Sequence, residues 1–132
     1  MSEPEPFFSI ITPVYNGAAF LPDLIASVQA QTFSDYEHII IDDGSTDDGA
    51  TIGVLEAVDD SRIHWWTRAN RGQYATQNEG IQAARGRWIV VIAADDILAA
   101  PDVLAGEGHH RRRGQALRRN GDDYPAELHA QG

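Results

Sequence analysis

The sequence predicts an α/β fold in which a mostly parallel sheet is flanked by helices. Apolar stretches alternate with amphipathic stretches along the chain, which is typical of strand–helix–strand units. The apolar stretches lack the polar alternation of a half-exposed sheet, so we expect helices to cover both faces. Two of these stretches end in paired carboxylates, Asp42 with Asp43 and Asp95 with Asp96. The pairs mark the strand ends as candidate sites.

Four apolar segments predict the strands. The first is ended by Pro13 and by the turn-forming pair Asn16 and Gly17. The third contains Trp65 and Trp66, which we expect to be strand and core residues with no further role. The four segments are residues 7–12, 36–41, 62–67 and 87–94.

Three segments between the strands predict helices. Residues 18–31 place leucine, isoleucine and valine at helical spacing. A weaker helix extends as far as Val58, with Ser45 or Thr46 as its N-cap. Residues 74–85 predict the third helix, and Gly86 is expected to close it in the left-handed conformation.

Composition narrows the class of protein. The chain has 132 residues, which suffice for one domain with its own core. Its formal net charge is −10, from 20 acidic and 10 basic residues. Phosphate contacts demand a basic surface, so we expect no nucleic-acid partner. No cysteine is present, which excludes disulfides and thiolate metal sites.

Two other α/β classes are excluded by missing residues. A phosphoacceptor receiver domain needs a lysine beside the phosphoryl group, but all ten basic residues are arginine. A dinucleotide-binding domain shows the pattern GxGxxG after its first strand. The corresponding stretch here reads "TPVYNG".

The cellular location is inferred from the amino-terminal residues and from hydropathy. The first residues, "MSEPEPFFS", are acidic and contain proline, unlike a signal peptide. No apolar stretch approaches the roughly 20 residues of a transmembrane helix. We therefore expect a cytoplasmic protein, with peripheral association at the inner face of the membrane as a variant of that location.

The paired carboxylates share an expected location. Ligands of open α/β sheets bind outside the carboxyl ends of the strands, where strand order reverses. If the first, second and fourth strands are neighbours, both pairs open onto one crevice. Gathered carboxylates repel one another unless a cation or hydrogen-bond donors compensate. The fitting cation is hard, Mg²⁺ or Mn²⁺, held together with phosphate oxygens.

Each candidate residue also has a structural alternative. The stretch from Asp42 to Ser45 is equally consistent with a simple turn, and Asp95 with Asp96 is equally consistent with a solvated strand end. Tyr15 fits a core aromatic residue on a loop. Arg68 and Arg71 could reach a diphosphate, although surface arginines are common.

Three ordered stretches carry a family resemblance: "SIITPVYNG", "LIASVQAQTFSDYEHIIIDDGSTDDG" and "NRGQYATQNEGIQAARGRWIVVIAADD". Together they resemble the amino-terminal half of glycosyltransferase family 2, the inverting enzymes of the Rossmann-like GT-A fold, over residues 8–102. The resemblance implies a nucleotide-diphosphate sugar donor, usually UDP- or dTDP-linked, and a divalent metal, Mg²⁺ or Mn²⁺. It also implies a saccharide or lipid-linked acceptor.

The resemblance assigns roles to residues by motif. Asp43, the second acid of "DDGS", looks like the contact to the base. Asp95 of "AADD" looks like the ribose contact, and Asp96 looks like the metal ligand. Three residues look like the loop of the first strand that lines the nucleotide: Thr12, Pro13 and Tyr15.

The resemblance ends shortly after the last acidic pair. Residues 104–132 contain four acids and half of the ten arginines, and apolar residues become sparse. We expect a nucleotide-sugar-binding domain over residues 1–103 and an atypical, disordered tail over 104–132. The family's general base lies beyond its acidic motif, so the resemblance implies a truncated domain. Two functions follow from it: glycosyl transfer, or nucleotide-sugar binding by a catalytically inactive module.

Overall fold

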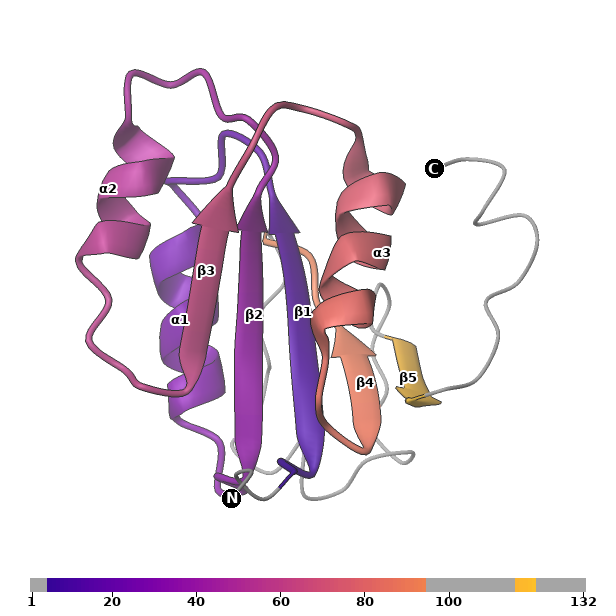
Figure 1. Cartoon of the computed structure of the whole chain (residues 1–132). Coiled ribbons are helices and arrows are strands. Elements are labelled where there is room, and N and C mark those ends of the chain that lie inside the picture. The colour runs from indigo at the N-terminus through magenta and orange to yellow at the C-terminus, as the bar shows by residue number, and fades with distance from the viewer. Residues whose placement is uncertain (1–4, 95–115, 121–132) are drawn as a thin grey trace.

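A five-stranded sheet forms the centre of the molecule in the computed structural model, which describes residues 5–94 and 116–120 (Figure 1). The strand order is β3-β2-β1-β4-β5. The first four strands are parallel and β5 is antiparallel to β4, which confirms the mostly parallel sheet. The strands are β1 (Phe8–Val14), β2 (Tyr36–Asp42), β3 (Ile63–Thr67), β4 (Trp88–Val91) and β5 (Ala116–Arg119).

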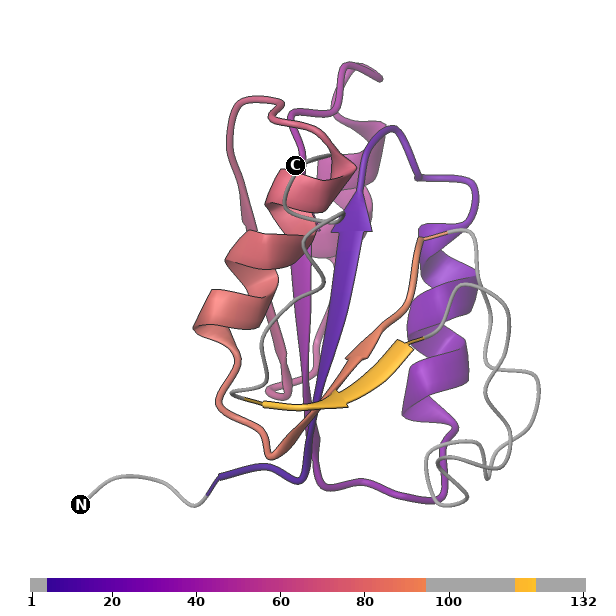
Figure 2. The same cartoon turned by 90° about the vertical axis from the view of Figure 1, so that its right-hand side faces the viewer.

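Helices cover both faces of the sheet, as Figure 2 shows with the sheet seen edge-on between α1 and α3. Leu21 and Leu55, from α1 (Leu21–Gln29) and α2 (Ala50–Glu56), pack with Phe8 in one hydrophobic cluster. Ile81, from α3 (Gln73–Ala83), packs with Ile11 in a second cluster. The side chains of β1 therefore alternate between two apolar layers.

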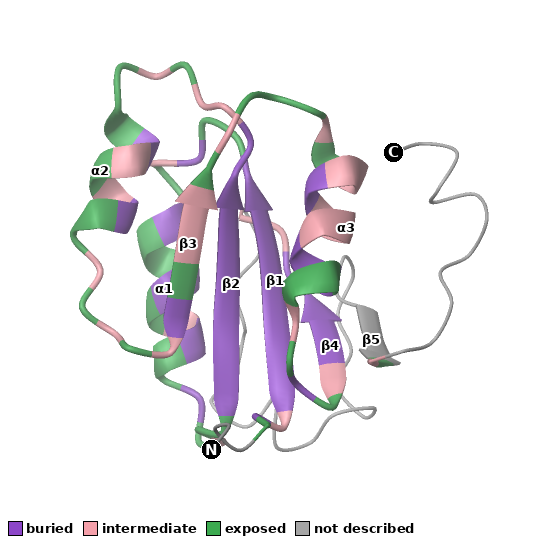
Figure 3. Cartoon of the chain, viewed as in Figure 1, coloured by how far each residue is buried: buried purple, intermediate pink, exposed green. Residues whose placement is uncertain are grey.

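Burial on both faces explains why the strands read as continuous apolar runs. Every residue of β1 and β2 is buried (Figure 3). Full burial of an isoleucine side chain stabilises a fold by about 1.5–3 kcal/mol. Ile10, Ile11, Ile40 and Ile41 contribute at this level from the two central strands.

Gly86 has a different role from the predicted one. The helix α3 ends at Ala83, and the following Ala84 is extended. Gly86 does not have a positive φ angle, so the prediction of a left-handed cap is wrong. A Cβ atom at Gly86 would lie 2.7 Å from the backbone N of Ser9. Glycine is required here because the chain passes against the backbone of β1.

The start of α2 also differs from prediction. The N-cap is Gly49, with φ of 82°, rather than Ser45 or Thr46. The Ser45 hydroxyl instead donates a hydrogen bond to Asp42 and accepts one from the backbone N–H of Asn16. The two hydroxyl residues thus belong to the loop before α2.

Strand β5 lies within the segment for which the sequence predicts disorder. Its residues pair with β4 from Ala116 to Arg119. Asn120 extends the contact, because its side-chain amide donates to the carbonyl oxygens of Ala84 at 3.2 Å and Gly86 at 2.8 Å. Residues 116–120 are therefore attached to the sheet, while the domain boundary at residue 103 remains a prediction.

Within residues 5–94 and 116–120, no helix has the length and hydropathy needed to cross a membrane. The cytoplasmic location stays a prediction from the sequence.

One histidine is enclosed in the sheet. His38 of β2 is fully buried, and its Nε2 lies 2.8 Å from the Thr12 hydroxyl of β1 in a hydrogen bond. Its Nδ1 has no hydrogen-bond partner among the described residues. Burial lowers the pKa of His38 from 6.5 to about 3, although the charge on Asp60 opposes the shift. The ring is therefore neutral in the folded protein.

This burial predicts a pH dependence of stability. The folded pKa of His38 lies below the unfolded value, so its stabilisation is complete above pH 6.5 and is lost as the pH falls toward 3. The free energy of unfolding should fall by up to about 1.4 kcal/mol per pH unit between pH 6.5 and 5. His38→Gln should remove this slope in urea unfolding. His64→Gln, at an exposed position of β3, is the control, and a parental slope in His38→Gln would contradict the account.

Candidate functional site

A cavity of about 460 Å³ opens at the carboxyl ends of the strands. β1 lies between β2 and β4, so the strand order reverses between β1 and β4. Binding sites of open α/β sheets occur at such a reversal. The cavity is lined by the end of β1, the loops that follow β1, β2, β3 and β4, and the first residue of α3: Pro13, Val14, Tyr15, Asp43, Asn70, Gly72, Gln73, Ala93 and Ala94.

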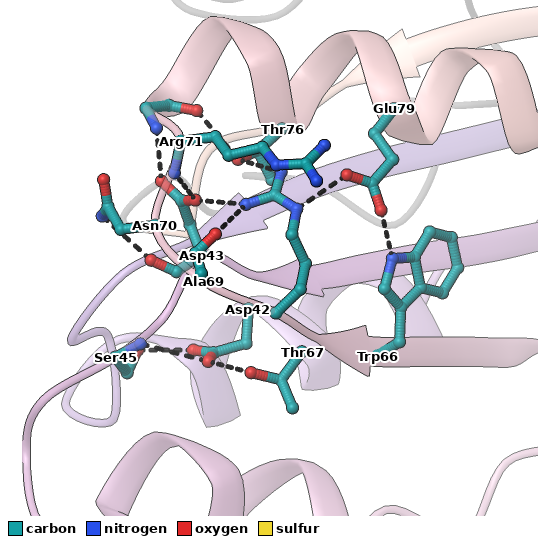
Figure 4. A network of polar contacts seen from close by, with 12 residues as sticks. Asp42, Asp43, Ser45, Trp66, Thr67, Ala69, Asn70, Arg71, Thr76 and Glu79 are labelled. Carbon is teal, nitrogen blue, oxygen red and sulfur yellow. Dashed lines mark hydrogen bonds and ion pairs between the residues drawn. The ribbon is translucent and has the colours of Figure 1, made fainter.

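Asp43 is held at the end of β2 by three donors (Figure 4). Its Oδ1 accepts hydrogen bonds from the Arg68 guanidinium and, at 2.8 Å, from the backbone N–H of Arg71. Its Oδ2 accepts one from the backbone N–H of Gly72 at 3.1 Å. Its own N–H donates to the carbonyl of Val14 at 2.8 Å. The carboxylate is thereby fixed between the β1 and β3 loops.

The charge state of Asp43 follows from these contacts. Burial acts to raise the pKa of Asp43, but the hydrogen bonds from the Arg71 N–H and the Arg68 guanidinium hold it below its usual value. The group is ionised at neutral pH. A carboxylate oxygen accepts about two hydrogen bonds, so Oδ2, with one backbone donor, has capacity for a donor from a ligand.

Tyr15 lines the cavity, and 49% of the residue is exposed. Its hydroxyl lies 3.4 Å from that of Thr46. The neighbouring Asn16 accepts from the Thr46 N–H at 2.7 Å and donates to the Thr46 hydroxyl at 3.3 Å. These hydrogen bonds join the β1 loop to the β2 loop. Tyr15 is therefore a surface residue on a fixed loop rather than a core residue.

Asp42 and Asp43 have different roles despite being adjacent. The carboxylate of Asp42 accepts from the Ser45 N–H at 3.1 Å, from the Ser45 hydroxyl and from the Thr67 hydroxyl at 2.7 Å. Asp42 is 1% exposed and does not line the cavity. The turn interpretation therefore holds for Asp42, whereas Asp43 faces the cavity.

Thr12 lies apart from the other residues that the sequence singles out. It is fully buried, and its hydroxyl is bonded to His38. Pro13 and Tyr15, which follow it, line the cavity together with Asp43. The structure thus brings three of these residues together and places the Thr12 side chain in the core.

The arginines are not placed as a pair of diphosphate contacts. The Arg68 side chain is 15% exposed, and its guanidinium is bonded to Asp43 and Glu79 within the protein. Arg71 contributes its backbone N–H to Asp43 and is exposed. No sequence motif points to Glu79 or to the loop residue Asn70, whose side chain donates to the Asp43 carbonyl at 2.9 Å. The sequence signal for the hydrogen bonds among these residues is weak, because it consists of polar residues that follow a strand.

Asp95 and Asp96 lie outside the described residues. Ala93 and Ala94, which precede them, line the cavity. Within residues 5–94 and 116–120, no group of three or more histidine or acidic residues is arranged to hold a metal ion. Asp43 is unsuited as a ligand because Arg68 already neutralises it. A metal at this site would depend on residues such as Asp96.

A sequence profile described as "Glycosyl transferase family 2" matches residues 9–105. The chain belongs to this family. A PGL/p-HBAD biosynthesis glycosyltransferase of Mycobacterium bovis is 38% identical over 101 residues, which are 76% of this chain and 40% of that protein. The uncharacterized glycosyltransferase EpsJ of Bacillus subtilis is 39% identical over 95 residues, 72% of this chain and 28% of EpsJ. The chain thus spans less than half the length of these relatives.

Solved structures share the fold. The mannosyltransferase PcManGT from Pyrobaculum calidifontis, in complex with GDP-Man and Mn²⁺, is similar with a TM-score of 0.67 and 25% identity, covering 76% of this chain and 31% of PcManGT. S. aureus TarS in complex with UDP-GlcNAc is similar with a TM-score of 0.63 and 26% identity, covering 68% of this chain and 27% of that one. The expected GT-A fold is confirmed.

The close packing of the β2 loop generates a stability prediction. Gly44 has φ of 72°, and a Cβ atom there would lie 2.6 Å from the backbone N of Asn70. Gly44→Ala should lower the free energy of unfolding by at least about 1–3 kcal/mol, because alanine is strained at this φ and meets backbone. Gly53→Ala is the matched control. It lies in α2 with open space around it and should stabilise by about 0.5–1 kcal/mol.

Chemical denaturation of both variants measures these changes. An equal change in the free energy of unfolding for the two substitutions would contradict the expected strain at Gly44.

Proposed function

We propose that this part of the chain is the nucleotide-sugar-binding half of an inverting, metal-dependent glycosyltransferase. The observation that carries the proposal is the cavity at the strand-order reversal, which places the exposed ring of Tyr15 and the ionised Asp43 together. An aromatic face and a fixed carboxylate are the two groups needed to stack and to hydrogen-bond a nucleobase. Membership of glycosyl transferase family 2 supports this assignment.

Base selection follows from the chemistry of Asp43. Its Oδ2 is an acceptor, so it favours a base with a ring N–H. Uracil and thymine carry N3–H, whereas cytosine has an acceptor at N3 that opposes a carboxylate. UDP- or dTDP-linked sugars, which the family resemblance implies, meet this requirement and are the proposed donors. TarS binds UDP-GlcNAc and PcManGT binds GDP-Man, and uracil and guanine both carry a ring N–H.

Two further contacts are proposed from the family motif. Asp95 is the proposed contact to the ribose and Asp96 the proposed metal ligand, and both follow Ala94 of the cavity wall. Carboxylate oxygens suit a hard cation. The Mn²⁺ in the PcManGT structure supports a divalent metal, with Mg²⁺ as the other candidate. Such an ion neutralises charge that develops on the leaving diphosphate.

The proposed transfer requires a general base for the hydroxyl of a saccharide or lipid-linked acceptor. Asp43 is the acid that lines the cavity among residues 5–94. It is a poor base, because the hydrogen bonds from Arg71 and Arg68 lower its pKa. This observation favours a second candidate function for these residues alone, namely binding of the nucleotide sugar without transfer.

Substitution of Asp43 tests the proposed base contact. Asp43→Asn should weaken UDP binding by about 10- to 100-fold, the equivalent of about 1.5–3 kcal/mol for a hydrogen bond to a charged group. It should weaken CDP binding less, because CDP has no ring N–H to lose. Calorimetric titration of both nucleotides measures the ratio. Glu56→Gln, on the exposed end of α2, is the control, and an unchanged UDP/CDP ratio in Asp43→Asn would refute the role.

A second substitution tests the proposed metal ligand. Asp96→Asn should weaken UDP binding in Mn²⁺ much more than it weakens uridine binding without metal, since only the first uses that carboxylate as a ligand. Asp95→Asn, at the proposed ribose contact, should weaken both. Equal losses for Asp96→Asn in the two titrations would argue against metal ligation.

A further inference from the structure

The Arg68 side chain forms hydrogen bonds within the protein and links Asp43 to Glu79. Its Nε donates to Glu79 Oε1 at 2.7 Å, and one terminal nitrogen donates to Asp43 and, at 2.9 Å, to the carbonyl of Ala69. The other terminal nitrogen donates to the Thr76 hydroxyl at 2.8 Å. A guanidinium has five N–H groups, and four are engaged inside the protein (Figure 4). Its position is therefore set by its partners.

Glu79 binds Arg68 at the Nε, away from the terminal nitrogen that contacts Asp43. One carboxylate oxygen accepts from Arg68, and the other accepts from the Trp66 indole N–H at 2.6 Å. The Trp66 ring packs against the hydrophobic cluster that contains Ile41 and Ile81. Burial acts to raise the pKa of Glu79, but the bonds from Trp66 and Arg68 lower it below its usual value. The ionised Glu79 carboxylate of α3 is thus linked to Trp66 of β3 and, through it, to the hydrophobic cluster.

A second chain of hydrogen bonds also links Arg68 to Asp43. The Thr76 hydroxyl, which accepts from Arg68, donates to the carbonyl of Gly72 at 2.8 Å. The N–H of Gly72 in turn donates to Asp43 Oδ2. The guanidinium and the loop that precedes α3 consequently hold both oxygens of the Asp43 carboxylate.

We propose that Glu79 is a positioning residue for base recognition, acting through Arg68 to aim Asp43 Oδ2 into the cavity. The inference rests on the proposed function, because it requires that Asp43 binds the base. Hydrogen bonds weaken steeply with misalignment, so the direction of Oδ2 governs base preference. Without Glu79, the Arg68 Nε loses its acceptor and the guanidinium turns toward Asp43 as its remaining anion.

The test compares UDP and CDP affinities by calorimetry. Glu79→Ala should reduce the preference for UDP over CDP about tenfold, the effect of weakening one charged hydrogen bond. Glu79→Gln should retain an intermediate preference, because its amide oxygen still accepts from Arg68 but its anionic charge is lost. Glu56→Ala on the exposed face of α2 should keep the parental preference.

A double-mutant cycle separates positioning from general stability. In the Asp43→Asn background, Glu79→Ala should cause no further change in preference. Trp66→Phe, which removes the indole N–H together with the five-membered ring and keeps an aromatic side chain, should reduce the preference about threefold, as expected for the loss of one hydrogen bond from a neutral donor. This variant provides the test if Glu79→Ala does not fold.

The outcomes distinguish the two proposals. A parental UDP/CDP preference in Glu79→Ala, or equal weakening of both nucleotides, overturns the positioning role and leaves the proposed function standing. An unaltered preference in Trp66→Phe with unfolded Glu79→Ala also overturns it. If the unsubstituted chain binds UDP and CDP with equal affinity, the proposed base contact is refuted, and the positioning role is refuted with it.

Discussion

The ion pair between Asp43 and Arg68 is the interaction on which the site depends. The two side chains are 5% and 15% exposed, and a carboxylate so enclosed must receive hydrogen bonds. The backbone N–H groups of Arg71 and Gly72 supply them, which fixes the course of the β3 loop and the start of α3. Removal of one partner from a buried pair costs about 3–5 kcal/mol. The pair thus links the local fold to the proposed ligand contact.

The parallel sheet supplies the frame for this interaction. β1 lies at the centre with β2 and β4 as neighbours, so the loops after these strands meet at one edge. The reciprocal bonds of Asn16 with Thr46 hold the β1 loop against the β2 loop. Tyr15 is consequently presented beside Asp43 with its ring exposed. Contacts within the protein fix the loop that carries Tyr15 and the Asp43 carboxylate, and groups fixed in this way lose little freedom on binding.

The sequence predicts the order of β1 to β4 and α1 to α3, although not β5, because apolar periodicity is a local property. It also predicts the shared edge, because the carboxyl ends of parallel strands lie together. Residue patterns alone do not separate Asp42 from Asp43, and only the family resemblance singles out Asp43, because the donors that hold the Asp43 carboxylate come from residues distant in the chain. Arg68 lies 25 residues after Asp43, and no spacing rule relates them. Gly86 is misassigned because a close approach to another strand has the same sequence signature as a helix cap.

The most direct measurement of the central claim is the proton NMR spectrum of ¹⁵N-labelled UDP bound to the chain. In the proposed complex the uracil N3–H is donated to Asp43 Oδ2 while the ring lies on Tyr15. The N3–H resonance should therefore exchange slowly with water in the complex and show cross-relaxation to the aromatic protons of Tyr15. An N3–H that exchanges as rapidly in the complex as in free UDP, with no contact to Tyr15, would contradict the account.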